Sequence, residues 1–324
     1  MGKYIDINQF LADDYATTFV VGARGVGKTV GALVYAIKKS YDENKKFIYL
    51  RRYQTEIDTL GLNLQLLSEL TGHKVAMEKV PDDSGRTSLM LTADNKPVGY
   101  LLALSVASKY KSTDYTGVFL IIYDEFIDIR GRELKNEVNL FLNFSMTVFR
   151  DFSKYKSLFL ANATDVFNCY FIAFNLVPKS KITKIKDLSV KVVMYKTSAE
   201  LEKRNKTPLA HLVYALDSGD PALSNDFHIN DTYVQKQEPN ATCIYIMRIG
   251  GRDYGLWKGG YYTLSKKFDP GSPKVSLDTL EPDYDFRPYY TQSIAAMLIG
   301  HALSFSDVMT RGVWLKFLKE RRLI

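Results

Sequence analysis

The sequence predicts an α/β fold, with a doubly wound and mostly parallel sheet followed by a smaller α+β domain. Over residues 17–195, short apolar runs alternate with stretches whose apolar side chains recur at helical spacing, the pattern of strands joined by helical crossovers. The run 119–123 is apolar throughout, as in a parallel strand that is buried on both faces. Beyond residue 230, three short alternating runs are joined by glycine pairs, which is typical of an antiparallel meander.

The first predicted strand, 17–21, is followed by a glycine-rich octapeptide. Gly22 to Thr29 read GARGVGKT, and residues 29–39 carry apolar side chains at helical spacing. This is a full match to the phosphate-binding loop, in which glycines turn backbone N–H groups toward phosphate oxygens and a helix N-terminus adds partial positive charge. Lys28 is expected to reach the terminal phosphates of ATP, and the Thr29 hydroxyl to hold Mg²⁺. A chance match to a glycine-rich turn is the alternative, which the flanking strand and helix disfavour. The residues expected to bind nucleotide are Gly22, Ala23, Arg24, Gly25, Val26, Gly27, Lys28 and Thr29.

The buried strand 119–123 ends in two acids, Asp124 and Glu125. An aspartate at the carboxyl end of such a strand binds Mg²⁺ together with the threonine of the phosphate-binding loop, so we assign Asp124 and Thr29 to the metal. Glu125 is placed to orient and deprotonate the attacking water, since a carboxylate beside Mg²⁺ and phosphate is costly without such a role. The alternative is that both acids cap the next helix, which the upstream loop disfavours.

The remaining elements of this part alternate in the same way. Asn162 follows the strand 158–161, where a polar side chain can sense the γ-phosphate or its attacking water. Capping of the turn is the alternative, and we favour the sensor. Arg51 and Arg52 end the second strand and are expected to face phosphate or DNA, or else to form salt bridges. The predicted elements are strand 47–50, helix 54–70, a small β excursion over 74–104, helix 136–150, strand 158–161, helix 169–176 and strand 190–195.

The chain is predicted to divide into three parts. Residues 1–196 form the nucleotide-binding domain. Residues 197–230 open with a capping box and end in a segment rich in Asp, Pro, Ser and Asn, which predicts a helical linker. Residues 231–324 form the second domain. Its predicted elements are strands 243–248, 253–258 and 260–265 and helices 290–304 and 306–322.

Composition and charge limit the kinds of partner and the cellular compartment that we expect for the protein. The net charge of +7 suggests a polyanionic partner, and most of the excess lies between Lys179 and Lys206, with nine basic residues against three acids. That segment is interpreted either as a nucleic-acid contact or as a solvated basic face. Cys169 and Cys243 form no disulfide framework, which favours a reducing compartment. Neither a signal peptide nor a membrane span is predicted, and the apolar run 294–303 is interpreted as a buried helix, so we expect a soluble cytosolic protein with no membrane partner.

Several sequence strings, taken together, carry a family resemblance. In order they are GARGVGKT (22–29), FIYLRRY (47–53), SVASKYKS (105–112), IIYDEF (121–126), TVFRDF (147–152), LANA (160–163) and YFIAFNLVP (170–178). Their order and spacing resemble those of the phi29-like phage encapsidation proteins, the DNA-packaging ATPases. FNLVP, FIYLRRY and the helix ending in TVFR make the match specific, whereas other strings are common among proteins with this loop. The resemblance is dense over 15–178 and thinner beyond.

The resemblance implies a fold and an activity. It implies a P-loop ATPase domain of the additional-strand, catalytic-glutamate class, in which the strand of Asp124 does not lie directly beside the strand of the phosphate-binding loop. It also implies a helical linker and a C-terminal domain resembling a degenerate RNase H-type nuclease. Family members form a ring, usually of five subunits, at the portal vertex of an empty procapsid and pump double-stranded DNA inward on ATP hydrolysis. The expected partners are therefore double-stranded DNA, further copies of the chain and a procapsid portal, in the host cytoplasm and transiently at the portal vertex. The use of a packaging RNA is left open.

The resemblance also implies residues that act across subunits. Arg150, in TVFR, corresponds to a finger that reaches the neighbouring subunit's site, where a cation stabilises charge developing on the γ-phosphate. The alternative is a cation favoured by the C-terminal end of a helix dipole. Lys111 corresponds to a second residue thought to act in trans. In the C-terminal domain, strand 243–248 offers no carboxylate, and two-metal cleavage needs clustered acids, so we expect a nucleic-acid- or portal-binding module without nuclease activity.

Two other functions remain as alternatives. One is a helicase or FtsK-like translocase acting on free DNA, which shares the nucleotide site and differs in the family-specific strings. The other is a nucleotide-switched scaffold with little hydrolysis, which Glu125 beside Asp124 disfavours because a slow switch needs no base there. The guanine-specific Asn-Lys-x-Asp string is absent, which favours ATP over GTP.

Overall fold

The computed structural model describes residues 4–81, 87–110, 113–127, 133–162, 168–174, 176, 178, 181–195, 207, 234, 236–259, 262–277 and 303–320. The chain divides into two compact units, one formed by Met1–Tyr170 with Pro178–His228 and the other by Phe171–Val177 with Ile229–Ile324. The helical linker predicted over 197–230 lies outside the described residues, Thr207 excepted. Within the described part, none of the helices combines the length and the apolar character needed to cross a membrane.

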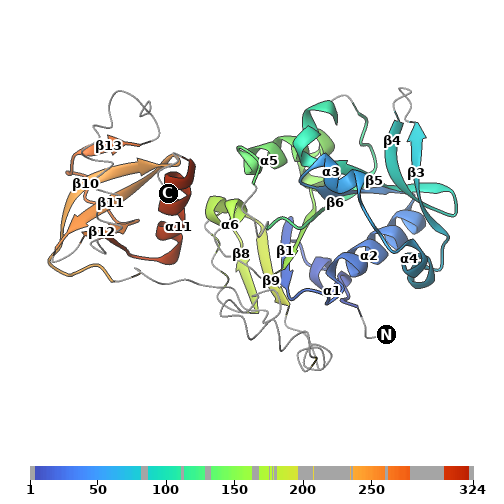
Figure 1. The fold of residues 1–324 in the computed structure, drawn as a ribbon, viewed down its shortest axis with the longest axis horizontal. Helices are drawn as coiled ribbons and strands as arrows, with labels where there is room; N and C mark the ends of the chain where they lie inside the picture. The colour runs from blue at the N-terminus through green and yellow to red at the C-terminus, as the bar shows by residue number, and fades with distance from the viewer. Residues whose placement is uncertain are drawn as a thin grey trace. The chain divides into compact units, whose positions relative to one another are not determined.

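A mostly parallel sheet organises the first unit (Figure 1). Its described strands run in the order β3-β4-β5-β2-β6-β7-β1-β9-β8, and the strands from β5 to β9 in that order all pair in parallel. Strand β7 separates β6, which ends at Asp124, from β1, which leads into the phosphate-binding loop, and this is the order that the family resemblance implies. The strands are β1 Thr17–Gly22, β2 Lys46–Arg51, β3 Val75–Pro81, β4 Thr87–Ala93, β5 Lys96–Ala103, β6 Val118–Asp124, β7 Ser157–Asn162, β8 Ile182–Ile185 and β9 Val190–Tyr195.

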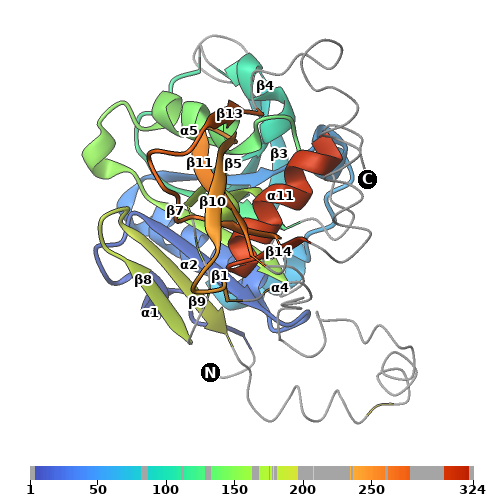
Figure 2. The same ribbon diagram turned by 90° about the vertical axis from the view of Figure 1, so that its left-hand side faces the viewer.

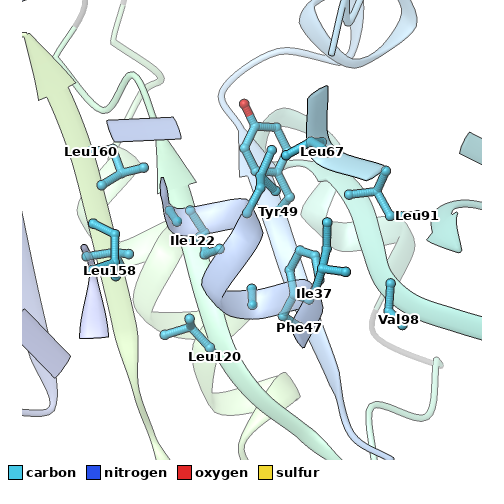
Figure 3. Close-up of a cluster of buried hydrophobic side chains, with 14 of the residues drawn as sticks. Ile37, Phe47, Tyr49, Leu67, Leu91, Val98, Leu120, Ile122, Leu158 and Leu160 are labelled. Carbon is cyan, nitrogen blue, oxygen red and sulfur yellow. The ribbon is translucent and has the colours of Figure 1, made fainter. Parts of the chain in front are cut away.

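Helix α2 (Lys28–Glu43) covers one face of this sheet. Its residues Leu33 and Ile37 lie one helical turn apart and share a buried core with side chains of β2, β6 and β7. Figure 3 shows part of this core, with Ile37 beside Phe47 of β2. Because α2 begins at the end of the glycine loop, packing of this helix against the sheet also determines where the loop lies. The short helices on the chain before and after β2 are α1 Asn8–Leu11, α3 Gln54–Asp58 and α4 Leu64–Thr71.

The opposite face of the sheet is covered by aromatic side chains. Phe19 of β1 stacks on Phe159 of β7 with ring centres 4.5 Å apart. Phe141 of α5 (Glu137–Val148) and Tyr170 of α6 (Cys169–Phe174) pack on the same Phe159 ring, at 4.7 Å and 5.0 Å. Helices thus cover both faces of the central strands, which explains why the run 119–123 carries apolar side chains without interruption. The described 3₁₀ helices are Leu104–Tyr110 and Phe152–Lys154.

The predicted β excursion over 74–104 is confirmed as three strands, but it is part of the main sheet. Strands β3, β4 and β5 pair in antiparallel succession, and β5 then pairs in parallel with β2. The excursion therefore extends the sheet whose strand β1 leads into the predicted phosphate-binding loop.

The predicted helix 54–70 is wrong in its middle. The structure has two helices there, α3 and α4, separated by residues 59–63. The Asn63 side chain accepts a hydrogen bond from the Leu66 amide at 3.0 Å and caps the start of α4. Buried Ile57 and Leu67 lie at a spacing that one continuous helix would also satisfy, so the periodicity concealed the break.

The basic segment between Lys179 and Lys206 is only in part a solvated face. Strand β8, which the sequence did not predict, pairs antiparallel with β9. Lys191 of β9 is 3% exposed and donates hydrogen bonds of 2.6 Å to the Asp13 carboxylate and to the Phe10 carbonyl. This lysine is therefore unavailable to nucleic acid. The exposed lysines of the segment's described part are Lys181, Lys184 and Lys186.

The second unit is built on a five-stranded sheet of order β13-β10-β11-β12-β14 among its described residues. Strands β10 to β12 form the predicted antiparallel meander. Helix α11 (Val308–Glu320) packs its buried Trp314 into a core with Leu264 and Phe305 of this sheet, and Figure 2 shows this helix beside the strands of its own unit. The strands are β10 Thr242–Ile249, β11 Arg252–Lys258, β12 Tyr262–Ser265, β13 Lys274–Ser276 and β14 Leu303–Phe305.

The predicted helix 290–304 is wrong at its end. Residues 303–304 belong to strand β14, which pairs in parallel with β12, while 290–302 lie outside the described residues. Leu303 and Phe305 are both buried, and the Ser304 hydroxyl lies 3.1 Å from that of Thr263 on β12. Thr263 and Ser304 are 41 positions apart in the sequence. Pairing between these distant strands thus overrides the local helical pattern. The predicted helix 306–322 is present as α11.

Candidate active site

The phosphate-binding loop joins the end of β1 to the start of α2. Gly25 and Gly27 have φ angles of +81° and +77°, a region that glycine enters without steric cost. Lys28 is the first residue of α2 and only 7% exposed. Its ammonium donates to the carbonyl oxygens of Gly22 at 2.9 Å and Ala23 at 2.7 Å. The loop therefore encloses a cation at a helix start, where backbone N–H groups can receive phosphate.

Asn162, the predicted sensor, lies beside this lysine. The register of the parallel pair places Asn162 at the end of β7 opposite Gly22 at the end of β1. Its side-chain oxygen accepts a hydrogen bond from Lys28 Nζ at 3.1 Å. The amide is thus directed at the phosphate-binding loop, which is the placement that the sensor interpretation requires.

Asp124 ends β6 and reaches Thr29 past the intervening strand β7. The hydroxyls of Thr29 and Tyr49 both donate to Asp124 Oδ2, at 2.8 Å and 2.7 Å. Burial, with the charge of Asp124 adding to it, raises the pKa of Tyr49 well above its usual value, so this hydroxyl remains a donor. Tyr49 was not predicted as a site residue. The available signal was a hydroxyl-bearing ring within an otherwise apolar buried strand, which needs a hydrogen-bond partner.

The residues Thr29 and Asp124 fit a magnesium ion. They bring a hydroxyl and a carboxylate oxygen together, and oxygen ligands are those that Mg²⁺ prefers. Within the described residues no cluster of three or more His, Cys, Asp or Glu could hold a metal by itself. In proteins Mg²⁺ takes one or two protein oxygens and completes its shell with phosphates and water.

Glu125 follows Asp124 in a backbone conformation that few residues other than glycine adopt. Its φ angle is +56°, which carries a strain cost unless surrounding contacts hold it. Its side chain is 55% exposed and forms an ion pair of 2.5 Å with Arg51. Arg51 also lies 3.7 Å from carboxylate oxygens of Asp124 and Glu56. Burial disfavours the charged guanidinium, but Tyr49, Asp124 and Glu125 outweigh that effect and raise the pKa of Arg51.

Arg52 is buried and contacts the backbone of Glu125. Its guanidinium donates to the carbonyl oxygens of Glu125 at 3.3 Å and Phe126 at 2.6 Å. The same group pairs with Glu137 through bonds of 2.7 Å and 3.1 Å. Burial disfavours the charged form, but the hydrogen bond to Glu137 and the surrounding charges raise the pKa of Arg52 above its usual value. Both arginines of the RR pair therefore form salt bridges, one of the alternatives that the sequence left open.

Arg150 lies away from the phosphate-binding loop of its own chain. Helix α5 ends at Val148, and exposed Arg150 lines a small pocket with residues 114–118, at the amino end of β6. The loop lies at the carboxyl ends of the parallel strands. The seven residues of β6, at about 3.3 Å each, place the two edges roughly 20 Å apart. Arg150 therefore cannot reach the nucleotide site of its own chain.

The structure thus brings one group of predicted residues together and leaves others apart. At one edge of the sheet Lys28 donates to Asn162, and the next residue, Thr29, donates to Asp124. Glu125 is adjacent, and its amide donates to Asp124. Within the loop, Ala23 and Val26 are buried, while Arg24 and Gly25 are exposed. Lys111, predicted to act in trans, lies outside the described residues.

Comparison with known families identifies the chain. The family model described as "Podovirus DNA encapsidation protein (Gp16)" matches residues 1–283. The chain belongs to this family. The chain is 27% identical over 330 residues to the DNA packaging protein of Bacillus phage B103, and the match covers 97% of this chain and 99% of that protein. The match to the DNA packaging protein of Bacillus phage phi29 has the same identity over 332 residues and covers 97% of each chain.

Solved structures resemble this chain in fold. The bacteriophage Phi-29 viral genome packaging motor assembly contains a chain that matches with a TM-score of 0.72 at 24% identity, covering 99% of this chain and all of that one. The N-terminal domain of the DNA packaging ATPase from bacteriophage phi29 matches with a TM-score of 0.51 at 31% identity, covering 59% of this chain and 95% of that domain. The resemblance that the sequence strings carried is therefore confirmed.

Proposed function

We propose that this encapsidation protein is an ATPase that couples hydrolysis of Mg²⁺-ATP to movement of double-stranded viral DNA into an empty procapsid. The observation that carries the proposal is the contact of Lys28 and Thr29 with Asn162 and Asp124, with Glu125 following Asp124. These are the parts that phosphoryl transfer to water needs: a phosphate cradle, a metal position, a base and a polar sensor. The names of relatives, a DNA packaging protein and a DNA packaging ATPase, support the same assignment.

Each residue has a role in this proposal. Lys28 and the loop amides bind the β- and γ-phosphates, and Asn162 orients the γ-phosphate or the attacking water. Mg²⁺ held by Thr29 and Asp124 supplies charge neutralisation of the phosphates when it is bound. Glu125 accepts the proton of the attacking water as general base. The proposal places the first unit in the additional-strand, catalytic-glutamate class of ATPases, which the strand order around β7 supports.

Arg150 completes the site of a neighbouring copy. It is exposed at the sheet edge opposite its own loop, where its charge acts on Asp114. A cation inserted from a second subunit stabilises the charge that develops on the transferred phosphoryl group, typically by ~10³–10⁵ in rate. Several copies must then be arranged head to tail, and a closed ring, which we expect to have five members, is the arrangement that gives every site its arginine.

The second unit is proposed to contact nucleic acid or the portal rather than to cut DNA. Its strand β10 carries no Asp or Glu, and two-metal cleavage requires clustered carboxylates. We retain the proposed likeness to a degenerate RNase H-type domain and the division at 1–196, 197–230 and 231–324. The motor would act in the host cytoplasm at the portal vertex of the procapsid, with a packaging RNA as a further possible partner.

The decisive experiment measures DNA-dependent ATP hydrolysis by Arg150→Ala, by Glu125→Gln and by mixtures of the two variants. Each variant alone is expected to be nearly inactive, because its sites lack either the arginine or the base. If Arg150 is supplied in trans, mixing restores activity, since a Glu125→Gln subunit still donates its arginine to the intact site of an Arg150→Ala neighbour. Mixtures that stay inactive, while wild-type protein hydrolyses ATP, would mean that each site works alone, and the ring proposal would be withdrawn.

A further inference from the structure

The pair Arg52–Glu137 is the most completely buried ion pair that the described residues contain near the site, and the proposed reaction does not use it directly. The side chains of Arg52 and Glu137 are 2% and 0% exposed. Burying two charges is costly unless their remaining hydrogen-bond capacity is filled. Here it is filled: Glu137 also accepts from the Tyr123 hydroxyl at 2.7 Å and from the Leu134 amide at 2.9 Å.

The part of Arg52 that Glu137 leaves free is directed at the backbone that carries the base. One guanidinium nitrogen donates to the Glu125 carbonyl at 3.3 Å and the other to the Phe126 carbonyl at 2.6 Å. A planar guanidinium can serve a carboxylate and two carbonyls at once, which a lysine ammonium on a flexible stem cannot do with fixed directions. Arg52 therefore joins the segment after Asp124 to the first residue of α5.

That segment needs holding, because Glu125 is in the left-handed region. A φ of +56° at a glutamate persists only where neighbouring contacts determine it. On one side the Glu125 amide donates to Asp124 Oδ1 at 3.0 Å, and on the other the Phe126 amide donates to the Leu160 carbonyl at 3.2 Å. These bonds engage the amides of the segment, and the carbonyls of Glu125 and Phe126 accept from Arg52. The backbone angle decides the direction in which the Glu125 side chain leaves the segment. In this structure its carboxylate is paired with Arg51, and in the proposed reaction it turns from that partner to the water that attacks the γ-phosphate.

We propose that the Arg52–Glu137 ion pair is a positioning device for the catalytic base: it holds the backbone of Glu125 and Phe126 so that the Glu125 carboxylate faces the attacking water. The inference rests on the proposed ATPase function. Neither Arg52 nor Glu137 touches substrate. A misplacement of a reacting group by about 1 Å can cost ~10²-fold in rate, so loss of this device lowers the hydrolysis rate and spares nucleotide binding, which the loop before α2 provides.

The test uses the full chain with the double substitution Arg52→Met and Glu137→Gln. It removes both charges, so no unpaired buried charge remains. The glutamine oxygen can still accept from the Leu134 amide, and its NH₂ group can donate to the Tyr123 hydroxyl. The matched control is Lys191→Met with Asp13→Asn, which removes another ion pair whose buried lysine also donates to a carbonyl. The two readouts are the single-turnover rate of ATP hydrolysis and the affinity for a fluorescent ATP analogue, with thermal unfolding of both variants as the check on folding.

The positioning device predicts a fall of ~10²-fold in the hydrolysis rate with nearly unchanged nucleotide affinity, in the Arg52/Glu137 variant and not in the control. Equal losses in both variants, a loss of affinity that accounts for the loss of rate, or an unchanged rate would overturn it. Arg52→Lys is the second variant if the first unfolds. It keeps the positive charge but loses the planar guanidinium that bonds Glu137 and both carbonyls, so a fall in the hydrolysis rate is still expected. An unchanged rate in folded Arg52→Lys would count against the proposal.

A third measurement separates this inference from the proposed function. Hydrogen exchange of the amides of residues 124–127 is followed without nucleotide. If Arg52 holds the segment, exchange accelerates in the Arg52/Glu137 variant and not in the control, and unchanged exchange rejects the device. Absence of any hydrolysis by wild-type protein with DNA and procapsids would instead overturn the proposed function, while the exchange result would still decide whether the ion pair holds the Glu125 backbone.

Discussion

At the scale of single residues, the site depends on how one carboxylate is held. Asp124 accepts hydrogen bonds from two hydroxyls at Oδ2 and from the Glu125 amide at Oδ1. It is 4% exposed, and three donors offset the cost of burying an acceptor-only group. The carboxylate therefore has one orientation, with an oxygen directed at Thr29, where the metal is proposed to bind.

The contribution of the Thr29 hydroxyl can be isolated with Thr29→Val, which keeps the branched shape and removes the oxygen. We expect Mg²⁺ to tighten nucleotide binding to the wild type and to have little effect on the variant, because one of the two metal ligands is removed. Titration of a fluorescent ATP analogue with and without Mg²⁺ measures this difference. Thr147→Val, at a half-buried position of α5 whose hydroxyl donates to the backbone of the same helix, is the control that should bind as the wild type does. If Mg²⁺ increased the nucleotide affinity of Thr29→Val as much as that of the wild type, Thr29 would not be a metal ligand.

At the scale of elements, the start of a helix can be set by a side chain that the periodicity alone does not reveal. Asn63 starts α4 and so divides the helix predicted over 54–70. Asp307 starts α11 in the same way, since its carboxylate accepts from the amides of Met309 and Thr310 at 3.0 Å each. A capping side chain satisfies amides that have no partner within the helix, so it decides the boundary where apolar spacing is compatible with several.

For α11 we expect Asp307→Ala to lower the free energy of unfolding of the second unit by about 1 kcal/mol, the usual value of an N-cap. Burial acts to raise the pKa of Asp307, but the hydrogen bonds to Thr310 and the charge of Lys266 lower it overall, below its ordinary value of 3.8. The stabilisation is therefore present above that ordinary value and is lost as the pH falls through the lower folded value. The difference between wild type and variant should accordingly shrink in strong acid.

Urea unfolding followed by tryptophan fluorescence measures this effect, because the two tryptophans of the chain, Trp257 and Trp314, both lie in the second unit. Asp269→Ala is the matched control, since Asp269 accepts the Gly271 amide in an exposed turn outside any helix. A loss of stability in the control as large as that in Asp307→Ala would mean that the cap has no special role.

At the scale of the whole molecule, the net charge of +7 is distributed less simply than the sequence suggested. Lys191 is buried against Asp13 and contributes nothing to an outer basic surface. Lys181 and Lys186 are exposed on either side of β8. A motor that accepts every DNA sequence needs phosphate contacts without base readout, so exposed lysines of this kind are the candidates for such contacts.

We therefore expect DNA affinity to fall steeply with salt and to be indifferent to base sequence. Replacing Lys181 and Lys186 with Gln should reduce the slope of log affinity against log salt by about 0.9 for each of these lysines that binds a phosphate. Fluorescence anisotropy with duplexes of different sequence, over a salt series, measures both properties. Lys45→Gln, an exposed lysine paired with Glu43, should leave the slope unchanged. An unchanged slope in the Lys181 and Lys186 variant would favour the alternative interpretation, in which the segment is a solvated basic face that does not bind DNA.

The sequence by itself determined the features that are local in the chain. The loop Gly22 to Thr29 and the acids Asp124 and Glu125 could be predicted because each is a short pattern attached to a strand end, and parallel strands bring their carboxyl ends to one edge. The family resemblance, now confirmed, supplied the order of β1, β7 and β6 and the assignment of Arg150, which no spacing within the chain contains.

Only the tertiary structure decided which distant residues meet. Tyr49 reaches Asp124, and Arg52 reaches Glu137, across separations of 75 and 85 positions. Strand β14 replaces the end of a predicted helix because β12 offers it backbone partners and a buried face. Local periodicity reports which side of an element is apolar, but the partner of a buried polar group is chosen by packing across the fold. A buried charge or hydroxyl must be paired wherever the chain brings a partner to it, and for that reason the groups that hold Glu125 became visible only in three dimensions.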